Sequence, residues 1–108
     1  SEFTETRADL DDVGNYIVSQ CDSAAMLLPA IYSSGDDLGR ATKGAALALK
    51  GRTLLYMASP LFGTPSTDKW QKAADANKAV IDLGVYNLKS VSDRMIMPIC
   101  SWIRTTLK

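Results

Sequence analysis

The sequence contains no histidine and only two cysteines, Cys21 and Cys100. Zinc and haem sites need histidine or closely spaced pairs of cysteines, so both kinds of site are excluded and no cofactor is expected. The absence of histidine also removes the usual general base near neutral pH. Both cysteines fall on apolar helical stripes, where free cysteine behaves as a small hydrophobic residue. Buried free thiols are therefore expected, with a disulfide as the open alternative.

Long hydrophobic runs are also absent, since no segment approaches the roughly 20 apolar residues needed to cross a bilayer. No signal peptide is recognisable either. Residues 1–3, Ser-Glu-Phe, look like a cloning scar, so we expect an excised fragment whose missing leader says nothing about its native location. A chain of 108 residues with 46% hydrophobic content supports one domain with a modest core.

The formal net charge is zero, but the charges are unevenly distributed along the chain. Residues 1–37 hold eight acidic residues and one basic residue, whereas residues 38–108 hold four acidic and eleven basic residues, so the two parts carry net charges of −7 and +7. Opposite charges favour packing of the N-terminal segment on the rest of the chain. A nucleic-acid surface is argued against, because proteins that bind nucleic acid are normally basic overall.

The longest apolar run, Arg40–Phe62, is typical of one buried helix that starts near Thr42 and ends at Ser59-Pro60. A helix with two apolar sides must have a neighbour on each side, which predicts a central helix. Because glycine destabilises a helix interior, Gly44 and Gly51 predict close contact with a neighbouring backbone. The two sides are formed by Gly44, Ala48, Gly51, Leu55 and Ala58, and by Ala46, Leu49, Thr53 and Tyr56.

A first helix is predicted to start at Asp9, which is suited to cap it. The helix should stop at Leu28, because the residue before Pro29 disfavours helical geometry. Its apolar residues recur at spacings of three and four, a pattern typical of core packing. The stripe consists of Leu10, Val13, Ile17, Cys21, Ala24, Ala25 and Leu28.

A third helix is predicted over about residues 68–83, with Thr67 or Asp68 as its cap. Gly84 can close its end in the left-handed conformation. The apolar face of this helix is expected to pack against the central helix. That face consists of Trp70, Ala73, Ala74, Asn77, Val80 and Ile81.

The polar face of the third helix carries Asp75, which is expected to pair with Lys72 or Lys78 at three-residue spacing. The three helical patterns are joined by loops rich in glycine, proline, serine and aspartate. Helices connected in this way pack antiparallel with their neighbours. The sequence therefore predicts an all-α fold of three to four antiparallel helices, arranged as tetratricopeptide-like hairpins.

Three features resemble ligand sites. Asp9, Asp11 and Asp12 could hold calcium, but they lack the glycine and distal glutamate of an EF-hand loop and they suit a helix N-terminus. The loop of residues 33–39 has two glycines and two aspartates but no phosphate-binding motif, so a plain turn is favoured. Trp70 could stack on a sugar ring, although its place on the apolar stripe favours packing. No residue is assigned to catalysis or to a metal.

We call residues 89–108 the tail. This segment is unassigned and is a candidate fourth helix. Pro98 lies inside its helical pattern and should kink the helix or delay its start. The tail is expected to fold back over an uncovered side of the central helix, with a weak dimer as the alternative. Its apolar stripe consists of Met95, Ile96, Ile99, Cys100, Ile103 and Leu107.

Residues 8–88 carry a pattern that resembles a known family, the SusD/RagB proteins. The similarity is densest over the central helix, in Gly39–Ala46 (GRATKGAA), Ala48–Arg52 (ALKGR) and Leu55–Phe62 (LYMASPLF). It continues through the third helix and is also present before the central helix. The further matching positions are Asp22, Ala25, Leu28, Pro29, Lys69-Trp70, Ala73-Ala74, Ala79–Ile81 and Gly84–Leu88.

This resemblance implies part of a lipid-anchored outer-membrane protein of Bacteroidetes, which captures oligosaccharides at the cell surface and passes them to a TonB-dependent transporter. It implies no catalysis. It also implies that residues 4–88 are a helical-repeat scaffold, because most sugar-contacting residues of the family come from other segments. The fragment itself is therefore expected to be soluble and to bind no glycan. Cys21 lies inside a helix and cannot stand in for the family's lipidated cysteine. The tail departs from the family, either as a divergent stretch or as an artefact of how the fragment was made.

Two other functions compete with this interpretation. A free-standing tetratricopeptide-type module would bind a peptide in a helical groove, but such modules normally carry at least three repeats and this chain offers about one and a half. An enzyme is disfavoured, because the sequence shows no nucleophile–base pair, metal-ligand set or phosphate loop. The fragment is expected to be a monomer or a weak homodimer.

Overall fold

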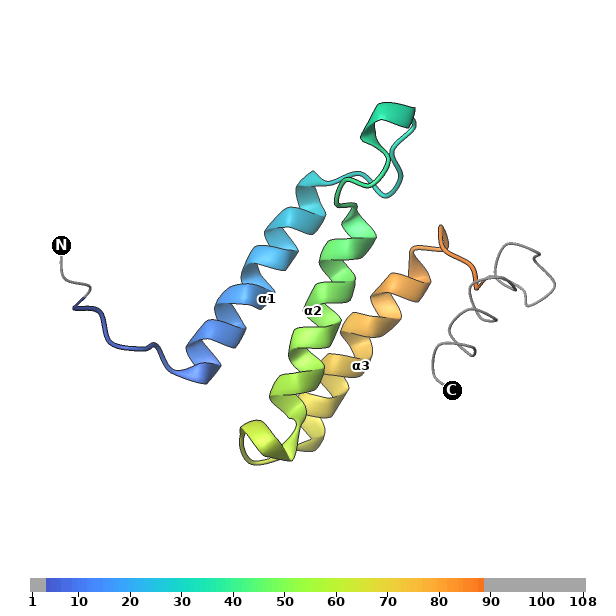
Figure 1. The fold of residues 1–108 in the computed structure, drawn as a ribbon. Coiled ribbons are helices and arrows are strands. Elements are labelled where there is room, and N and C mark those ends of the chain that lie inside the picture. The colour runs from blue at the N-terminus through green and yellow to red at the C-terminus, as the bar shows by residue number, and fades with distance from the viewer. Residues whose placement is uncertain (1–3, 89–108) are drawn as a thin grey trace, which may run out of the picture.

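The computed structural model describes residues 4–88, and over this range the protein is all-α. The predicted fourth helix and Cys100 lie outside the described residues. The described chain forms three α-helices joined by two short 3-10 helices, which confirms the predicted fold class (Figure 1). In chain order the elements are α1 (Leu10–Leu27), η1 (Gly35–Asp37), α2 (Lys43–Ala58), η2 (Pro60–Phe62) and α3 (Thr67–Asp82).

Helix α2 lies between α1 and α3 and packs against both of them, and consecutive helices run in opposite directions (Figure 1). The prediction that this segment forms the central helix is therefore confirmed. The three helices form a single layer that curves toward one side of α2. On that side, residues of α1 and α3 line a common groove with residues of α2. The opposite side of α2 is left open between its two neighbours.

Short-range interactions fix the ends of α1 and α2. The Asp9 carboxylate accepts a hydrogen bond from the Leu10 amide at 2.8 Å, and Thr42 Oγ1 accepts one from the Ala45 amide at 3.3 Å. Both helices end where the residue before a proline turns to extended geometry, at Leu28 and Ser59. The predicted starts and stops of these helices are confirmed.

The N-terminal cap of α3 differs from the prediction. Ser66, rather than Thr67 or Asp68, is the cap, and its Oγ accepts a hydrogen bond from the Lys69 amide at 3.3 Å. Serine, threonine and aspartate are all good cap residues, so three in a row leave the position undetermined by sequence. At the other end, Gly84 has a φ of +66°, which confirms the left-handed closure.

Small residues make the contacts between the helices. A side chain added at Gly51 would collide with Asn77 of α3, and one added at Gly14 would collide with Met57 of α2. Gly44 is covered in the same way by the ring of Tyr86, which follows α3. Both glycines are closely covered, as predicted, but by the side chains of Tyr86 and Asn77 and not by a neighbouring backbone. The buried hydrophobic residues are also small or medium-sized: Cys21, Ala25, Ala58, Ala73 and Ala76.

The apolar stripes of the two outer helices do not point straight at α2. On α1 the buried residues are Gly14, Cys21 and Ala25, whereas Leu10 and Val13 of the predicted stripe are 46% and 42% exposed. Because residues 14, 21 and 25 share a line along a helix, the packed face is rotated away from the larger apolar side chains.

The same rotation occurs on α3, where the buried residues are Ala73 and Ala76. Trp70 and Ile81, predicted to pack, are instead 43% and 77% exposed. Small residues allow the closest approach of two helices, so they define the contact while the larger residues are left beside it. At 43% exposure Trp70 is still partly packed, so the packing role expected for it is met only in part among the described residues.

The ion pairs on α3 also differ from the prediction. Lys72 pairs with Asp68 at 3.0 Å and Lys78 pairs with Asp82 at 2.8 Å, both at four-residue spacing. Asp75 instead accepts a hydrogen bond from Gln71 at 2.8 Å. Four-residue spacing was available to both lysines and replaces the three-residue pairs expected for Asp75. The Asp82 hydrogen bond and charge raise the pKa of Lys78, so its ammonium is charged at neutral pH and its contribution to the pair is lost as the pH rises through that pKa.

Candidate functional site

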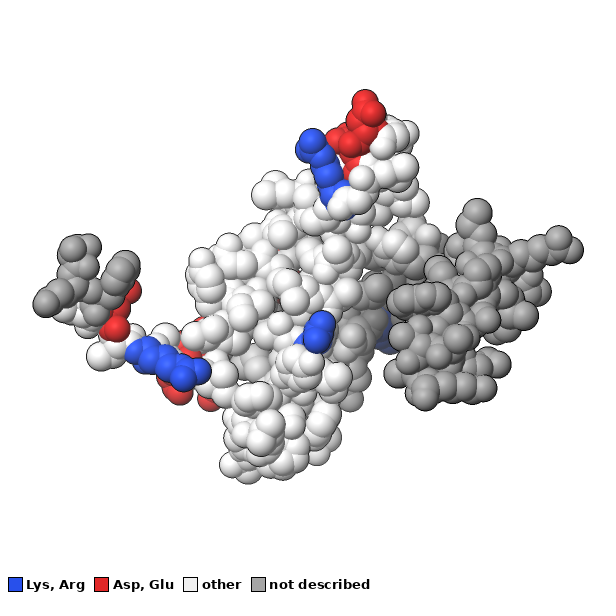
Figure 2. All heavy atoms as spheres, viewed as in Figure 1, with Lys and Arg blue, Asp and Glu red and all other residues white. Residues whose placement is uncertain are grey.

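The most distinctive surface of the described chain is a nearly uncharged face, which we call the front face. It lies on the open side of α2 and continues onto both neighbouring helices, because residues turned away from the α2 contact on α1 and α3 flank it. Figure 2 looks onto this face and shows few charged groups over the three helices. Its exposed large residues are Leu10, Val13, Tyr16, Leu49, Leu55, Tyr56, Trp70 and Ile81.

Two hollows run along the front face between α1 and α2. The first, of about 400 Å³, is lined by Tyr16, Ile17, Gln20, Cys21, Ala24, Leu28, Ala41, Ala45, Ala46 and Leu49. The second, of about 210 Å³, is lined by Leu10, Val13, Gly14, Ile17, Thr53, Tyr56, Met57 and Phe62. Both share Ile17, so they form one apolar furrow along the helix pair. Neither is lined by a charged residue, which suits an apolar side chain better than an ionic or sugar ligand.

Arg52 is the charged residue that α2 places on the front face. Its guanidinium lies 5.5 Å from the centre of the Tyr56 ring, and Nε and Nη2 donate to the Tyr56 hydroxyl at 3.3 and 3.2 Å. Arginine is the cation most often found over an aromatic ring, and its planar head can stack there while its stem covers apolar surface. Arg52 is therefore compatible with an apolar contact on this face.

The opposite side of α2 forms what we call the back groove, of about 490 Å³, which is lined by both charged and apolar residues. Its lining comes from all three helices: Asn15, Val18, Lys50, Leu54, Lys72, Asp75, Ala76 and Ala79. Beside it, Lys50 Nζ contacts both carboxylate oxygens of Asp22, at 2.7 and 2.9 Å. This pair joins α1 to α2, in agreement with the attraction expected between the acidic and basic parts of the chain.

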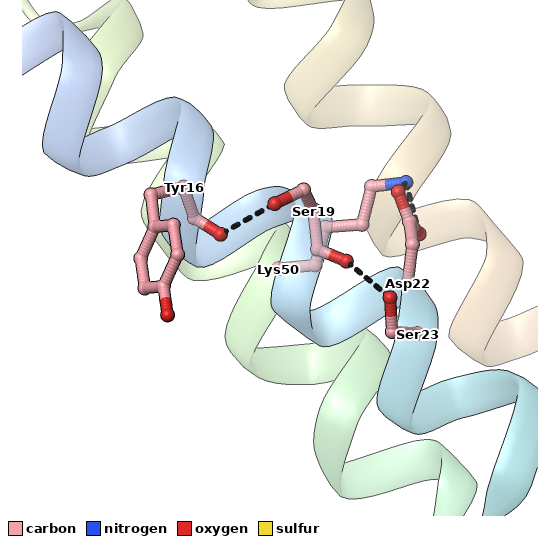
Figure 3. A network of polar contacts seen from close by, with 5 residues as sticks. All are labelled: Tyr16, Ser19, Asp22, Ser23 and Lys50. Atoms are coloured by element: carbon pink, nitrogen blue, oxygen red, sulfur yellow. Dashed lines mark hydrogen bonds and ion pairs between the residues drawn. The ribbon is translucent and has the colours of Figure 1, made fainter.

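Figure 3 shows the Asp22–Lys50 pair and Tyr16 on opposite sides of α1. Between them, Ser19 Oγ donates to the Tyr16 carbonyl at 2.8 Å and Ser23 Oγ donates to the Ser19 carbonyl at 3.1 Å (Figure 3). These serines bond to their own helix, so they stay outside the interhelix contact. Helix α1 thus separates the charged back groove from the uncharged front face.

Tyr86 joins the chain after α3 to the start of α2. Its ring lies against Gly44, and its hydroxyl lies 3.0 Å from Thr42 Oγ1 and 3.4 Å from the Ala30 carbonyl, to which it donates. The loop between α1 and α2 is held at the same end, where the Lys43 amide donates to the Pro29 carbonyl at 2.9 Å. These contacts are structural and bring no reactive group together.

The sequence features that resembled ligand sites have structural roles. Asp9 caps α1, and the neighbouring Asp11 and Asp12 are exposed in its first turn. The loop of residues 33–39 contains η1, held by an ion pair between Asp37 and Arg40 at 3.1 Å. Cys21 is buried, as predicted, and is bonded to no other cysteine among the described residues, which do not include Cys100. Trp70 lies at the edge of the front face and lines neither of its two hollows.

The described residues contain no group of three or more His, Cys, Asp or Glu side chains placed to hold a metal ion. Of the helices in this part of the chain, none has the length and hydrophobicity needed to cross a membrane. Sequence reasoning expected an uncovered side of the central helix but not the extension of this face onto α1 and α3, although all of its large residues except Tyr16 belong to a predicted apolar stripe. The missing signal was the position of Gly14 and Ala76, which determine how α1 and α3 are rotated.

Comparison with known proteins found no matching family model, no curated protein and no solved structure similar to this chain.

Proposed function

We propose that this chain is a helical scaffold segment of a SusD/RagB-like glycan-binding protein, which in its full length passes oligosaccharides to a TonB-dependent transporter at the bacterial outer membrane. The proposal rests on the residue pattern of positions 8–88 and on where those residues lie in the fold. The chain itself is assigned a packing role and no catalytic role.

One observation supports the proposal most strongly: residues that carry the resemblance occupy the contacts between helices. Gly44, Gly51 and Ala58 are buried on α2, and Ala73 is buried on α3. Tyr86, in the matching stretch that follows α3, covers Gly44. A pattern that includes the residues at the helix contacts suits a scaffold, because the function of a scaffold is to hold other segments in place.

The test is the genomic region that encodes the chain. The proposal expects an open reading frame several times longer, with a lipoprotein signal at its start and a TonB-dependent transporter gene beside it. A complete reading frame without that signal, or one with no such transporter gene nearby, would overturn it. A biochemical test follows from the same locus: the full-length protein should bind an oligosaccharide in calorimetry, whereas the present chain should not.

A second function, a tetratricopeptide-type module that binds a peptide helix, is favoured by the apolar furrow between α1 and α2. An amphipathic helix places apolar residues every three to four positions and can lie in such a furrow. This alternative predicts binding of an amphipathic peptide by the isolated chain. The scaffold assignment predicts no such binding once the furrow is covered.

A further inference from the structure

The front face requires a covering element, for a reason that the helix rotations make specific. Both outer helices turn their larger apolar residues past α2 and toward the front, as Val13 on α1 and Ile81 on α3 show. A stable domain buries such stripes between two packed layers, and the described helices provide only one. The covering element must therefore lie over the front side of α2, where it can contact all three helices at once.

The described chain ends close to that position. Tyr86 lies against Gly44 near the start of α2, and Leu88, two residues later, is 100% exposed. Twenty residues follow Leu88. A linker over residues 89–92 can span up to about 13 Å, which is enough to pass from the end of α3 to the first turn of α2.

We propose that the tail, residues 89–108, docks on the front face as a helix lying along α2. Residues 93–107 would form a helix about 22 Å long, close to the roughly 24 Å of the 16-residue α2. The three apolar residues Ile99, Ile103 and Leu107 share one side of this helix, whether it is kinked at Pro98 or begins there. The proposal is independent of the glycan-related function, because it concerns only how this chain covers its own surface.

Charge distribution favours the same orientation. The stripe of the tail is uncharged, as are the linings of both front-face hollows. On a helical wheel Arg94 and Lys108 fall on the side opposite the stripe and Arg104 lies at its edge, so their charged groups can remain in water when the stripe is buried. The back groove, with Lys50 and Lys72 in its lining, would instead place lysines against an apolar stripe.

Proximity in the full-length chain provides a direct test. In a Cys21→Ala background the native Cys100 is paired with a cysteine introduced by Ala48→Cys on the front face, and a short bis-maleimide cross-linker is added to dilute protein. The matched control is Lys72→Cys in the back groove, which lies on the other side of the layer. The expected result is an intrachain cross-link formed several-fold more efficiently with Ala48→Cys than with Lys72→Cys, identified by peptide mass spectrometry.

Two outcomes of this experiment would overturn the proposal. Equal intrachain yields from the two positions would mean that the tail has no preference for the front face. Predominantly interchain cross-links from Ala48→Cys would assign the face to a second copy of the chain instead. A circular dichroism spectrum matching that of the native chain confirms in each case that the helices are retained.

A second measurement keeps the proposal testable if a cysteine variant does not fold. Ile103→Asp should expose the front face of the full-length chain, so binding of a hydrophobic fluorescent dye should rise several-fold and light scattering should show association. Ser101→Asp, on the solvent side of the same segment, introduces the same charge and should leave both readings at the native level. Native dye binding by Ile103→Asp would show that the tail covers nothing.

Discussion

Asn77 of α3 lies directly over Gly51 of α2. Its Nδ2 donates to the carbonyl of Ala73 at 2.8 Å and approaches the carbonyl of Gly51 at 3.4 Å. A Cβ added at Gly51 would lie 2.5 Å from the Asn77 side-chain oxygen. The glycine thus allows a polar side chain to sit at the contact between two helices while its amide hydrogens remain satisfied.

Gly51→Leu should destabilise the protein, because the larger side chain must displace Asn77 and separate α2 from α3. Overpacking of this kind costs about 1–3 kcal/mol of the free energy of unfolding, and the loss of the Asn77 hydrogen bonds would add to it. Urea denaturation followed by circular dichroism measures the change.

The matched control is Arg52→Leu, the next residue on α2, which is exposed on the front face. It should change the free energy of unfolding by much less than Gly51→Leu. Lys50, on the other side of Gly51, is a poorer control because its ion pair joins α2 to α1, whereas the contacts of Arg52 with Tyr56 stay within α2. Equal denaturation midpoints for the Gly51 and Arg52 variants would refute the assigned helix contact.

Tyr86→Phe should weaken the connection between the end of α3 and the start of α2. The variant keeps the ring over Gly44 but loses the hydroxyl that contacts Thr42 Oγ1 and donates to the Ala30 carbonyl. Loss of a hydrogen bond of this type costs about 0.5–1.5 kcal/mol. Tyr16→Phe, at a tyrosine that is 65% exposed, is the control and should be close to neutral in the same urea titration. A neutral Tyr86→Phe would mean that its hydroxyl is solvated rather than bonded.

Much of the fold could be predicted because its signals are local. The turn to extended geometry before Pro29 and Pro60, and the cap at Thr42, depend on neighbouring residues and were read correctly. The closeness of α2 to its neighbours was also predictable, because glycines such as Gly51 have little other reason to occupy a helix interior. These features need no knowledge of how distant segments meet.

The rotation of α1 and α3 about their axes was not predictable in the same way. A hydrophobic pattern gives most weight to large residues such as Val13 and Trp70, whereas the contacts are made at Gly14 and Ala76, which contribute little to it. Whether the large or the small residues of α1 and α3 are buried depends on the residues of α2 that they contact. The extension of the front face onto α1 and α3 follows from this rotation, so the sequence could predict only the uncovered side of the central helix.

The Asp22–Lys50 pair should contribute a small coupling energy. The Lys50 side chain is 24% exposed and that of Asp22 is 48% exposed, so water still screens the pair. A double-mutant cycle with Asp22→Asn and Lys50→Met should give a coupling of at most about 1 kcal/mol, which falls as salt is added. The exposed Lys72–Asp68 pair of α3 is the reference and should give a smaller value. Coupling that is large and unaffected by salt would contradict this exposure.

The final prediction concerns sugars, because Trp70 is half exposed and an indole ring can stack on a sugar. A sugar site also needs polar groups that converge on the ligand's hydroxyls. The two hollows of the front face offer few such groups, chiefly Gln20 and Thr53, and Trp70 lines neither. Calorimetry of the present 108-residue chain against starch and a panel of soluble oligosaccharides should therefore detect no binding heat. A micromolar ligand would refute the scaffold assignment, and loss of that binding in Trp70→Ala, with Tyr16→Ala unchanged, would identify the indole as its contact.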